Sequence, residues 1–151
     1  LLNSLIATGY KIPSKEKGIM ISSGGTKEKA SMLDAAQALV KNGYTVYASE
    51  GTAKFLNDNH VKAIAVAWPD EDHKDMPNVM EMIADHKFDL IVNIPKNHTK
   101  RELTNGYRIR RGAIDHNIPL MTNARLASAF IEAFCTLSQD DLQIKSWQEY
   151  E

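Results

Sequence analysis

The chain has 151 residues, of which 43% are hydrophobic and 25% charged, proportions that are ordinary for one soluble globular domain. Its formal net charge of -1 provides no overall field to attract nucleic acid or an acidic membrane surface, so we expect neither as a partner. No apolar run approaches the roughly 20 residues that span a bilayer. The single cysteine, Cys135, lies in an apolar helical run and is expected to be a buried structural thiol in a reducing compartment.

In chain order, short apolar runs alternate with helical segments. Residues 1–13 are typical of a helix end followed by an extended linker, so we expect them to be the tail of a preceding domain, with the domain proper at 14–151. Strands are predicted at 18–22, 44–48, 61–66, 88–95 and 118–121. Helices are predicted at 27–42, 52–57, 78–86, 107–117 and 122–137, with a long polar loop at 96–106 and a polar tail after 137.

This alternation predicts an α/β domain with three layers, a parallel sheet covered by helices on both faces. Ligands of such sheets bind beyond the carboxyl ends of the strands. The residues at those ends are polar, small or aromatic, and together they predict one crevice: 22–27, 49–52, 67–68, 93–96 and 122–123.

The stretch from Tyr44 to Phe55 is the central strand-to-helix unit of this prediction. Its turn, Ser49-Glu50-Gly51-Thr52, places backbone N–H groups and hydroxyls at a helix N-terminus, where the helix dipole favours an anion. Ser49 or Thr52 could equally serve only as the cap of that helix, so both interpretations stay open at this point.

Other strand ends also offer donors for a carboxylate or phosphate, namely Asn93, Lys96 and the indole N–H of Trp68. Trp68 could instead fill the floor of the crevice by packing alone. A second positive group is either a solvated face or a surface for an anionic ligand or an acidic partner: Lys100, Arg101, Arg108, Arg110 and Arg111.

Sequence motifs for catalysis or metal binding are missing. The five histidines are scattered without metal-ligand spacing, and the phosphate-loop and Gly-x-Ser-x-Gly spacings are absent. The carboxylates at 70–75 could serve in catalysis by their position, but acidic surface loops are usually only solvated, and we interpret them in that way. The residues therefore favour ligand binding over chemistry.

Several motifs occur together in an order that is specific to one family. They are Ala-Ser-Glu-Gly-Thr (48–52), Val-Ala-Trp-Pro (66–69), Pro-Asn (77–78), Asp-Leu-Ile-Val-Asn (89–93), Tyr-Arg-Ile-Arg-Arg (107–111) and Ile-Pro-Leu-Met-Thr-Asn (118–123). Over nearly the whole chain the sequence resembles the methylglyoxal-synthase-like domain. More closely, it resembles the C-terminal allosteric domain of the carbamoyl phosphate synthetase large subunit.

The resemblance implies a five-stranded parallel sheet of Rossmann or flavodoxin type, with an effector pocket at the strand ends and no chemistry or cofactor within this domain. The parent enzyme is an ATP-dependent ligase, with Mg or Mn, that makes carbamoyl phosphate for arginine, urea or pyrimidine synthesis. Its remaining domains and its amidotransferase subunit or domain are the implied partners, and a homo-oligomer is a further option. The implied compartment is the cytoplasm, or the mitochondrial matrix for the ammonia-dependent type.

Two kinds of small anionic effector are implied, UMP or IMP for bacterial enzymes and N-acetyl-L-glutamate for the ammonia-dependent type. The positions that match the acetylglutamate pocket are Ser49, Thr52, Trp68 and Asn93. Two further asparagines of that pocket fall at Lys96 and at Gly106, which has Asn105 beside it. The nucleotide pocket uses a lysine on the first helix, a role that Lys27 or Lys29 could fill.

Two alternatives come from other classes of function. Methylglyoxal synthase removes phosphate from dihydroxyacetone phosphate with an aspartate in a Gly-Gly-Asp stretch. The matching window here has Asp75 about one position away and lacks the glycines, which argues against the lyase. The other alternative is an interaction module that docks through the arginine face and the tail around Trp147.

Overall fold

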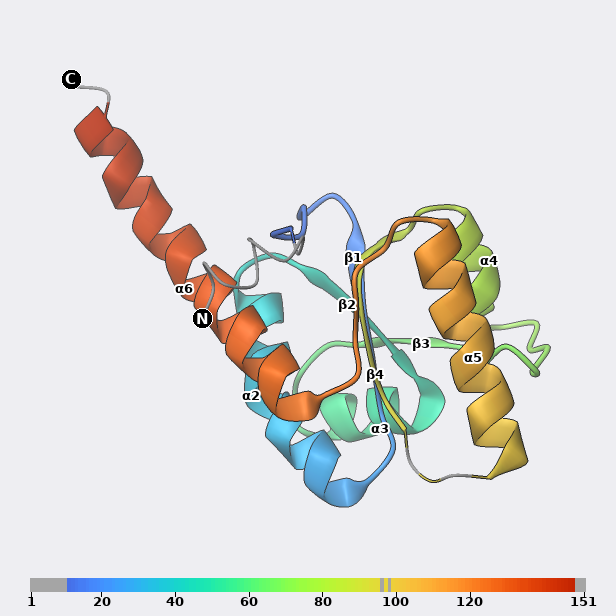
Figure 1. The fold of residues 1–151 in the computed structure, drawn as a ribbon. Helices are drawn as coiled ribbons and strands as arrows, with labels where there is room; N and C mark the ends of the chain where they lie inside the picture. The colour runs from blue at the N-terminus through green and yellow to red at the C-terminus, as the bar shows by residue number, and fades with distance from the viewer. Residues whose placement is uncertain (1–10, 96, 98, 149–151) are drawn as a thin grey trace.

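Five strands form a parallel sheet in the computed structural model, which describes residues 11–95, 97 and 99–148 (Figure 1). The strands are β1 (Gly18–Ser23), β2 (Thr45–Ser49), β3 (Ile64–Val66), β4 (Phe88–Ile94) and β5 (Leu120–Met121). They lie in the order β3-β2-β1-β4-β5, and every neighbouring pair is parallel. The predicted five-stranded parallel sheet is confirmed.

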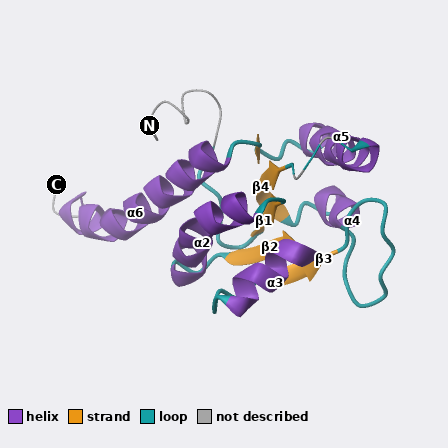
Figure 2. Ribbon diagram, turned by 90° about the horizontal axis from the view of Figure 1, so that it is seen from below, coloured by secondary structure: helices purple, strands orange, loops and turns teal. Residues whose placement is uncertain are grey.

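The helices divide between the two faces of the sheet (Figure 2). One face carries α2 (Thr26–Lys41), α3 (Glu50–Asp58) and α6 (Ala124–Gln148), and the other carries α4 (Val79–Ala84) and α5 (Lys100–Asp115). The chain builds β1 to β3 toward one edge and then crosses back to place β4 and β5 on the other side of β1. The predicted three-layer architecture is therefore confirmed. None of the described helices has the length and apolar character needed to cross a membrane.

Two hydrophobic cores attach the helices to the sheet. β1 is buried along its whole length, and its successive side chains point to opposite faces. Ile19 and Ile21 therefore pack in the core with α2 and α6, and Met20 packs in the core with α4 and α5. Burial on both faces explains why β1 and β4 are nearly continuous apolar runs in the sequence.

The prediction of a polar loop at 96–106 is wrong for most of its length. Helix α5 begins at Lys100, because the Thr99 side chain accepts a hydrogen bond from the Glu102 backbone N–H at 3.2 Å and caps the helix. Gly106 lies inside the helix instead of marking its start. A glycine usually marks the end of a helix, but the Thr-x-x-Glu pattern at 99–102 is a capping motif that indicates a helix start before Gly106.

The remaining differences lie at the ends of elements. Strands β3 and β5 are shorter than predicted, with three and two residues, as is common for strands at the edge of a sheet. Helix α6 continues to Gln148, so the predicted polar tail after 137 is wrong, and the helix runs on past the sheet (Figure 1). The side chain of Trp147 and residues 1–10 of the predicted linker lie outside what the structure describes.

Candidate functional site

A pocket of about 230 Å³ opens at the carboxyl edge of the sheet, beyond the ends of β1 and β2. The strand order reverses at β1, and open α/β sheets bind ligands outside the strand ends near such a reversal. Four of the predicted site residues line this pocket: Lys29, Ser49, Thr52 and Trp68. The tertiary fold thus brings together donors from α2, the β2–α3 turn and the loop after β3.

A larger hollow of about 820 Å³ lies at the opposite edge, between residues 11–14 and the connection from α5 to β5. It contains none of the predicted donors. Because ligands of parallel sheets bind at the carboxyl edge, the smaller pocket is the candidate site.

The hydroxyls of the β2–α3 turn form hydrogen bonds with residues at the end of the neighbouring strand, β1. Ser49 Oγ lies 3.0 Å from Ser22 Oγ and 3.1 Å from Thr52 Oγ1. Thr52 Oγ1 accepts a hydrogen bond from the Ser23 N–H at 3.1 Å and lies 3.2 Å from the Ser23 carbonyl oxygen, to which it donates. Ser49 occupies the N-cap position of α3 but makes no side-chain capping bond. The interpretation of Ser49 as a simple cap is therefore wrong.

The structure separates the two candidate lysines of α2. Lys29 is half-buried and lines the pocket, with its Nζ 3.5 Å from the position that a Cβ on Gly51 would take. Lys27 is exposed and lies outside the pocket lining. An ammonium group over Gly51, in the first turn of α3, adds positive charge where the helix dipole is already positive.

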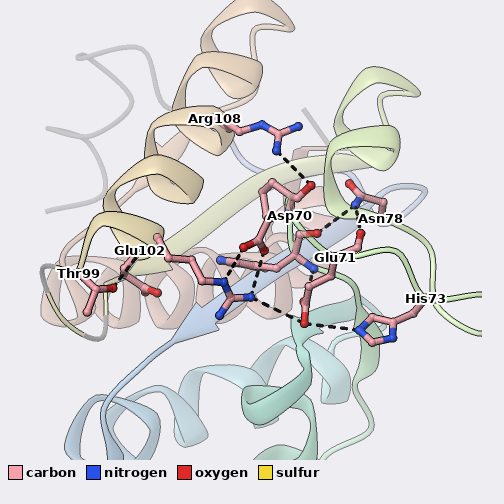
Figure 3. Close-up of polar contacts among 10 residues, drawn as sticks. Asp70, Glu71, His73, Asn78, Thr99, Glu102 and Arg108 are labelled. Atoms are coloured by element: carbon pink, nitrogen blue, oxygen red, sulfur yellow. Dashed lines mark hydrogen bonds and ion pairs between the residues drawn. The ribbon is translucent and has the colours of Figure 1, made fainter.

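Trp68 packs in the hydrophobic core and also lines the pocket. It is 9% exposed and belongs to the core that contains Met20 and Val66. Its backbone N–H donates to Glu71 Oε1 at 2.8 Å, and its carbonyl accepts from Asn78 Nδ2 at 3.0 Å (Figure 3). These bonds hold the loop after β3 against the pocket, so the packing and contact interpretations of Trp68 are compatible.

The two predicted asparagines lie beside the pocket but outside its lining. Asn93 is buried on β4, beside Ser22 in the sheet register. Asn105 is buried on α5, and its Nδ2 has no hydrogen-bond partner among the described residues. A buried amide without a partner is unfavourable, which marks Asn105 as a group available to a ligand or water. Lys96 lies outside the described residues.

The basic group on α5 divides into three different environments. Arg101 lines the pocket and donates Nε and Nη2 to the two carboxylate oxygens of Asp70, at 2.5 and 3.0 Å (Figure 3). This guanidinium lowers the pKa of Asp70. Arg108 donates to the Pro69 carbonyl at 3.1 Å, and Arg111 pairs with Asp115 at 3.4 Å.

Sequence reasoning missed several residues of the pocket. The loop predicted at 96–106 includes Arg101, whereas the capping pattern at Thr99 indicates the first turn of a helix there. Ser23 was only part of a strand-end range, but its Oγ is buried, lies in a residue that lines the pocket, and has no partner among the described residues. The pocket also contains three carboxylates: Glu50, Glu71 and Glu102.

One group of side chains has a spacing that could accept a metal ion. The ligand atoms of Glu50, Glu71 and His73 lie within 4.8 Å of one another. Glu71 is already bonded to the Trp68 N–H and has Arg101 Nη2 3.9 Å away, so its carboxylate is partly engaged. Glu71 and His73 are two positions apart, but Glu50 lies 21 residues before Glu71, so ligand spacing in the sequence did not predict this group.

Cys135 is buried, as predicted. Burial raises the pKa of its thiol from 9.0 to about 11, so the thiol stays protonated at neutral pH and is a poor nucleophile.

A three-layer parallel α/β fold with a pocket of polar and charged side chains at the carboxyl edge defines a domain of the open-sheet α/β class. The family model described as "MGS-like domain" matches residues 31–122. The chain belongs to the MGS-like domain family. A crystal structure of methylglyoxal synthase from Elizabethkingia anophelis has the same fold, with a TM-score of 0.52 and 14% identity, and the match covers 80% of each chain.

Curated relatives are much longer proteins. The chain is 38% identical to the multifunctional protein CAD of Squalus acanthias and 37% identical to the multifunctional protein URA2 of Saccharomyces cerevisiae. It is 38% identical to the human mitochondrial carbamoyl-phosphate synthase [ammonia]. In each case 87% of this chain is matched, but only 6%, 6% and 9% of the relative.

Proposed function

We propose that this chain is the effector-binding regulatory domain of a carbamoyl phosphate synthetase. The ligand is a small anion bound at the carboxyl edge of the sheet, with N-acetyl-L-glutamate as the first candidate and UMP or IMP as the second. The human mitochondrial carbamoyl-phosphate synthase [ammonia] and the multifunctional proteins among the relatives support this reading of the whole protein.

The observation that carries the proposal is the placement of Lys29 over the start of α3. Its ammonium lies near Gly51, and the helix start has no side-chain cap at Ser49. Unpaired amides, the helix dipole and an ammonium together favour a carboxylate or phosphate. The Ser49 and Thr52 hydroxyls and the Trp68 side chain line the same pocket.

The size of the pocket supports the smaller of the two candidate effectors. Its volume of about 230 Å³ is below the roughly 300–1,000 Å³ typical of pockets for drug-sized ligands. An acylated amino acid fits such a space more readily than a nucleotide, which carries a base and a ribose in addition to its phosphate.

The proposal assigns no chemistry and no cofactor to this domain. ATP, with Mg or Mn, would act in other domains of the synthetase, which with the amidotransferase subunit or domain are the proposed partners. Asp75, the residue that the lyase alternative requires, is exposed and lies outside the pocket lining. Phosphate release from dihydroxyacetone phosphate that disappears in Asp75→Asn would reverse this order of preference.

The test is a thermal shift and titration of the 151-residue chain with N-acetyl-L-glutamate, UMP and IMP. A ligand at 100 times its Kd stabilises the folded state by about 2.7 kcal/mol. We expect Lys29→Gln to weaken binding roughly tenfold, because a charge-assisted hydrogen bond is lost. Lys27→Gln, the matched control on the same helix, should bind like the unaltered chain.

Two outcomes would count against the proposal. Absence of stabilisation by all three ligands, in a folded sample, would leave the interaction module as the remaining alternative. Equal effects of Lys27→Gln and Lys29→Gln would show that general charge, and not the site over Gly51, determines binding.

A further inference from the structure

We infer that Arg101 is a second anion-binding residue of the pocket, which exchanges its internal partner Asp70 for a carboxylate of the ligand. The pocket therefore selects a ligand with two separated anionic groups, a dicarboxylate, over a ligand with one. This inference rests on the proposed function, since it describes how the same site recognises its effector.

The geometry of Arg101 is that of a carboxylate-binding group. Its Nε and Nη2 bond to both oxygens of Asp70, at 2.5 and 3.0 Å, which is the two-point pairing that a guanidinium makes with a carboxylate. Arg101 lines the same pocket as Lys29. Asp70 lies outside the lining of that pocket, in an adjoining hollow that Arg101 also lines, so Arg101 stands between its internal carboxylate partner and the candidate site.

The Arg101–Asp70 pair is placed so that a ligand can displace it. The side chains are 61% and 36% exposed, and exposed ion pairs contribute little to stability because water solvates both partners. Asp70 uses two of the five N–H donors of the guanidinium, so a ligand can begin to bind before Asp70 leaves. Exchange needs only a side-chain movement at the rim of the pocket.

The two cations approach the pocket from opposite faces of the sheet. Lys29 belongs to α2 on one face, and Arg101 belongs to α5 on the other. The lining also contains three carboxylates, so the pocket as a whole has no positive field that would attract every anion: Glu50, Glu71 and Glu102. An anion is therefore held by direct pairing at separate points, which matches two carboxylates joined by a short chain better than one phosphate group.

The experiment is calorimetric titration of the 151-residue chain with three probes: N-acetyl-L-glutamate and its two monoamides, in which one or the other carboxylate is replaced by an amide. We expect Arg101→Met to weaken binding of the dicarboxylate roughly tenfold. The same substitution should not change binding of the monoamide that lacks the carboxylate facing Arg101. This difference identifies a specific pairing and not a general loss of charge.

Two further variants complete the design. Arg111→Met is the matched control, because Arg111 is also 61% exposed and paired with a carboxylate on α5, but lies outside the pocket. It should bind all probes like the unaltered chain. Asp70→Asn removes the internal competitor and should tighten dicarboxylate binding by up to about fivefold.

The outcomes separate this inference from the function on which it rests. Binding of N-acetyl-L-glutamate that Arg101→Met leaves intact would overturn the inference and leave the proposed function standing. Equal weakening of all three probes, an equal effect of Arg111→Met, or no tightening by Asp70→Asn would also overturn it. Failure of the unaltered chain to bind any probe would reject the acylated amino acid as effector and this inference with it.

Discussion

Thr52 illustrates how one side chain can serve both the fold and the pocket. It is 2% exposed, and its hydroxyl bonds to the N–H and to the carbonyl of Ser23 at the end of β1. Those bonds join the β2–α3 turn to the neighbouring strand and set the position of α3 at the pocket. A polar residue that sequence patterns mark as a ligand contact is therefore also part of the structural frame.

We predict that Thr52→Val destabilises the fold by about 1–3 kcal/mol, because it keeps the shape but leaves the buried N–H of Ser23 without a partner. Urea unfolding at equilibrium measures this loss. Ser49→Ala is the control and should cost less, since the Ser49 hydroxyl bonds to two other hydroxyls, those of Ser22 and Thr52, and not to a backbone N–H among the described contacts. Equal losses for the two variants would contradict the assigned role of Thr52.

At the scale of elements, α5 connects the pocket to the rest of its face. Its first turn supplies Arg101 and Glu102 to the pocket, and its middle packs on α4 and β4. The loop after β3 is tied to this helix by the Asp70–Arg101 pair and by the bond from Arg108 to Pro69 (Figure 3). The start of α5 therefore determines the geometry of one whole side of the pocket.

Gly106→Ala tests the extent of α5. In a helix interior, replacing glycine by alanine raises the free energy of unfolding by up to about 1 kcal/mol. The added Cβ at position 106 would lie 3.9 Å from Asn93 Nδ2, which is an ordinary contact distance. We expect a higher melting temperature. Gly112→Ala is the matched control, because its Cβ would lie 3.0 Å from Met80 Cε and the gain should be smaller or absent. Destabilisation by Gly106→Ala would argue against a continuous helix.

At the scale of the whole molecule, β1 is the centre of the fold. It pairs with β2 on one side and β4 on the other, and it separates the two hydrophobic cores. The candidate pocket lies at its carboxyl end, so a rigid strand supports a site whose outer wall is formed by exposed side chains. This arrangement favours ligand binding by side-chain adjustment without changes in the sheet.

We predict that the slowest backbone amides in native-state hydrogen exchange belong to β1 and β4. These strands are paired on both sides and buried, so their amides exchange only on global unfolding. Amides of β3 and β5, at the edges, should exchange faster. Protection that is uniform across all five strands would contradict this hierarchy.

Patterns between residues that are close in the chain predicted more of this structure than contacts between distant residues could. Hydrophobic periodicity and turn residues are local, and they were sufficient to predict the alternating strands and helices, the parallel sheet and the turn at Ser49 and Thr52. Local patterns also mislead: they predict a loop up to Gly106 and a helix end near residue 137, whereas α5 begins at Lys100 and α6 continues to Gln148. The strand-end residues at 22–24, 49–52 and 68 line the pocket as predicted, but 93–95 and 122–123 lie outside its lining.

Local sequence patterns are enough to predict the fold class, the edge of the sheet that carries the pocket, and the turn of hydroxyls at its centre. The three-dimensional packing is needed to show that Lys29 and not Lys27 lines the pocket, that Asn93 and Asn105 lie beside it, and that Arg101 pairs with Asp70. The reason is physical. Strand order and helix packing bring these groups together across long stretches of chain, 31 residues in the case of Arg101 and Asp70, and no local pattern records that pairing.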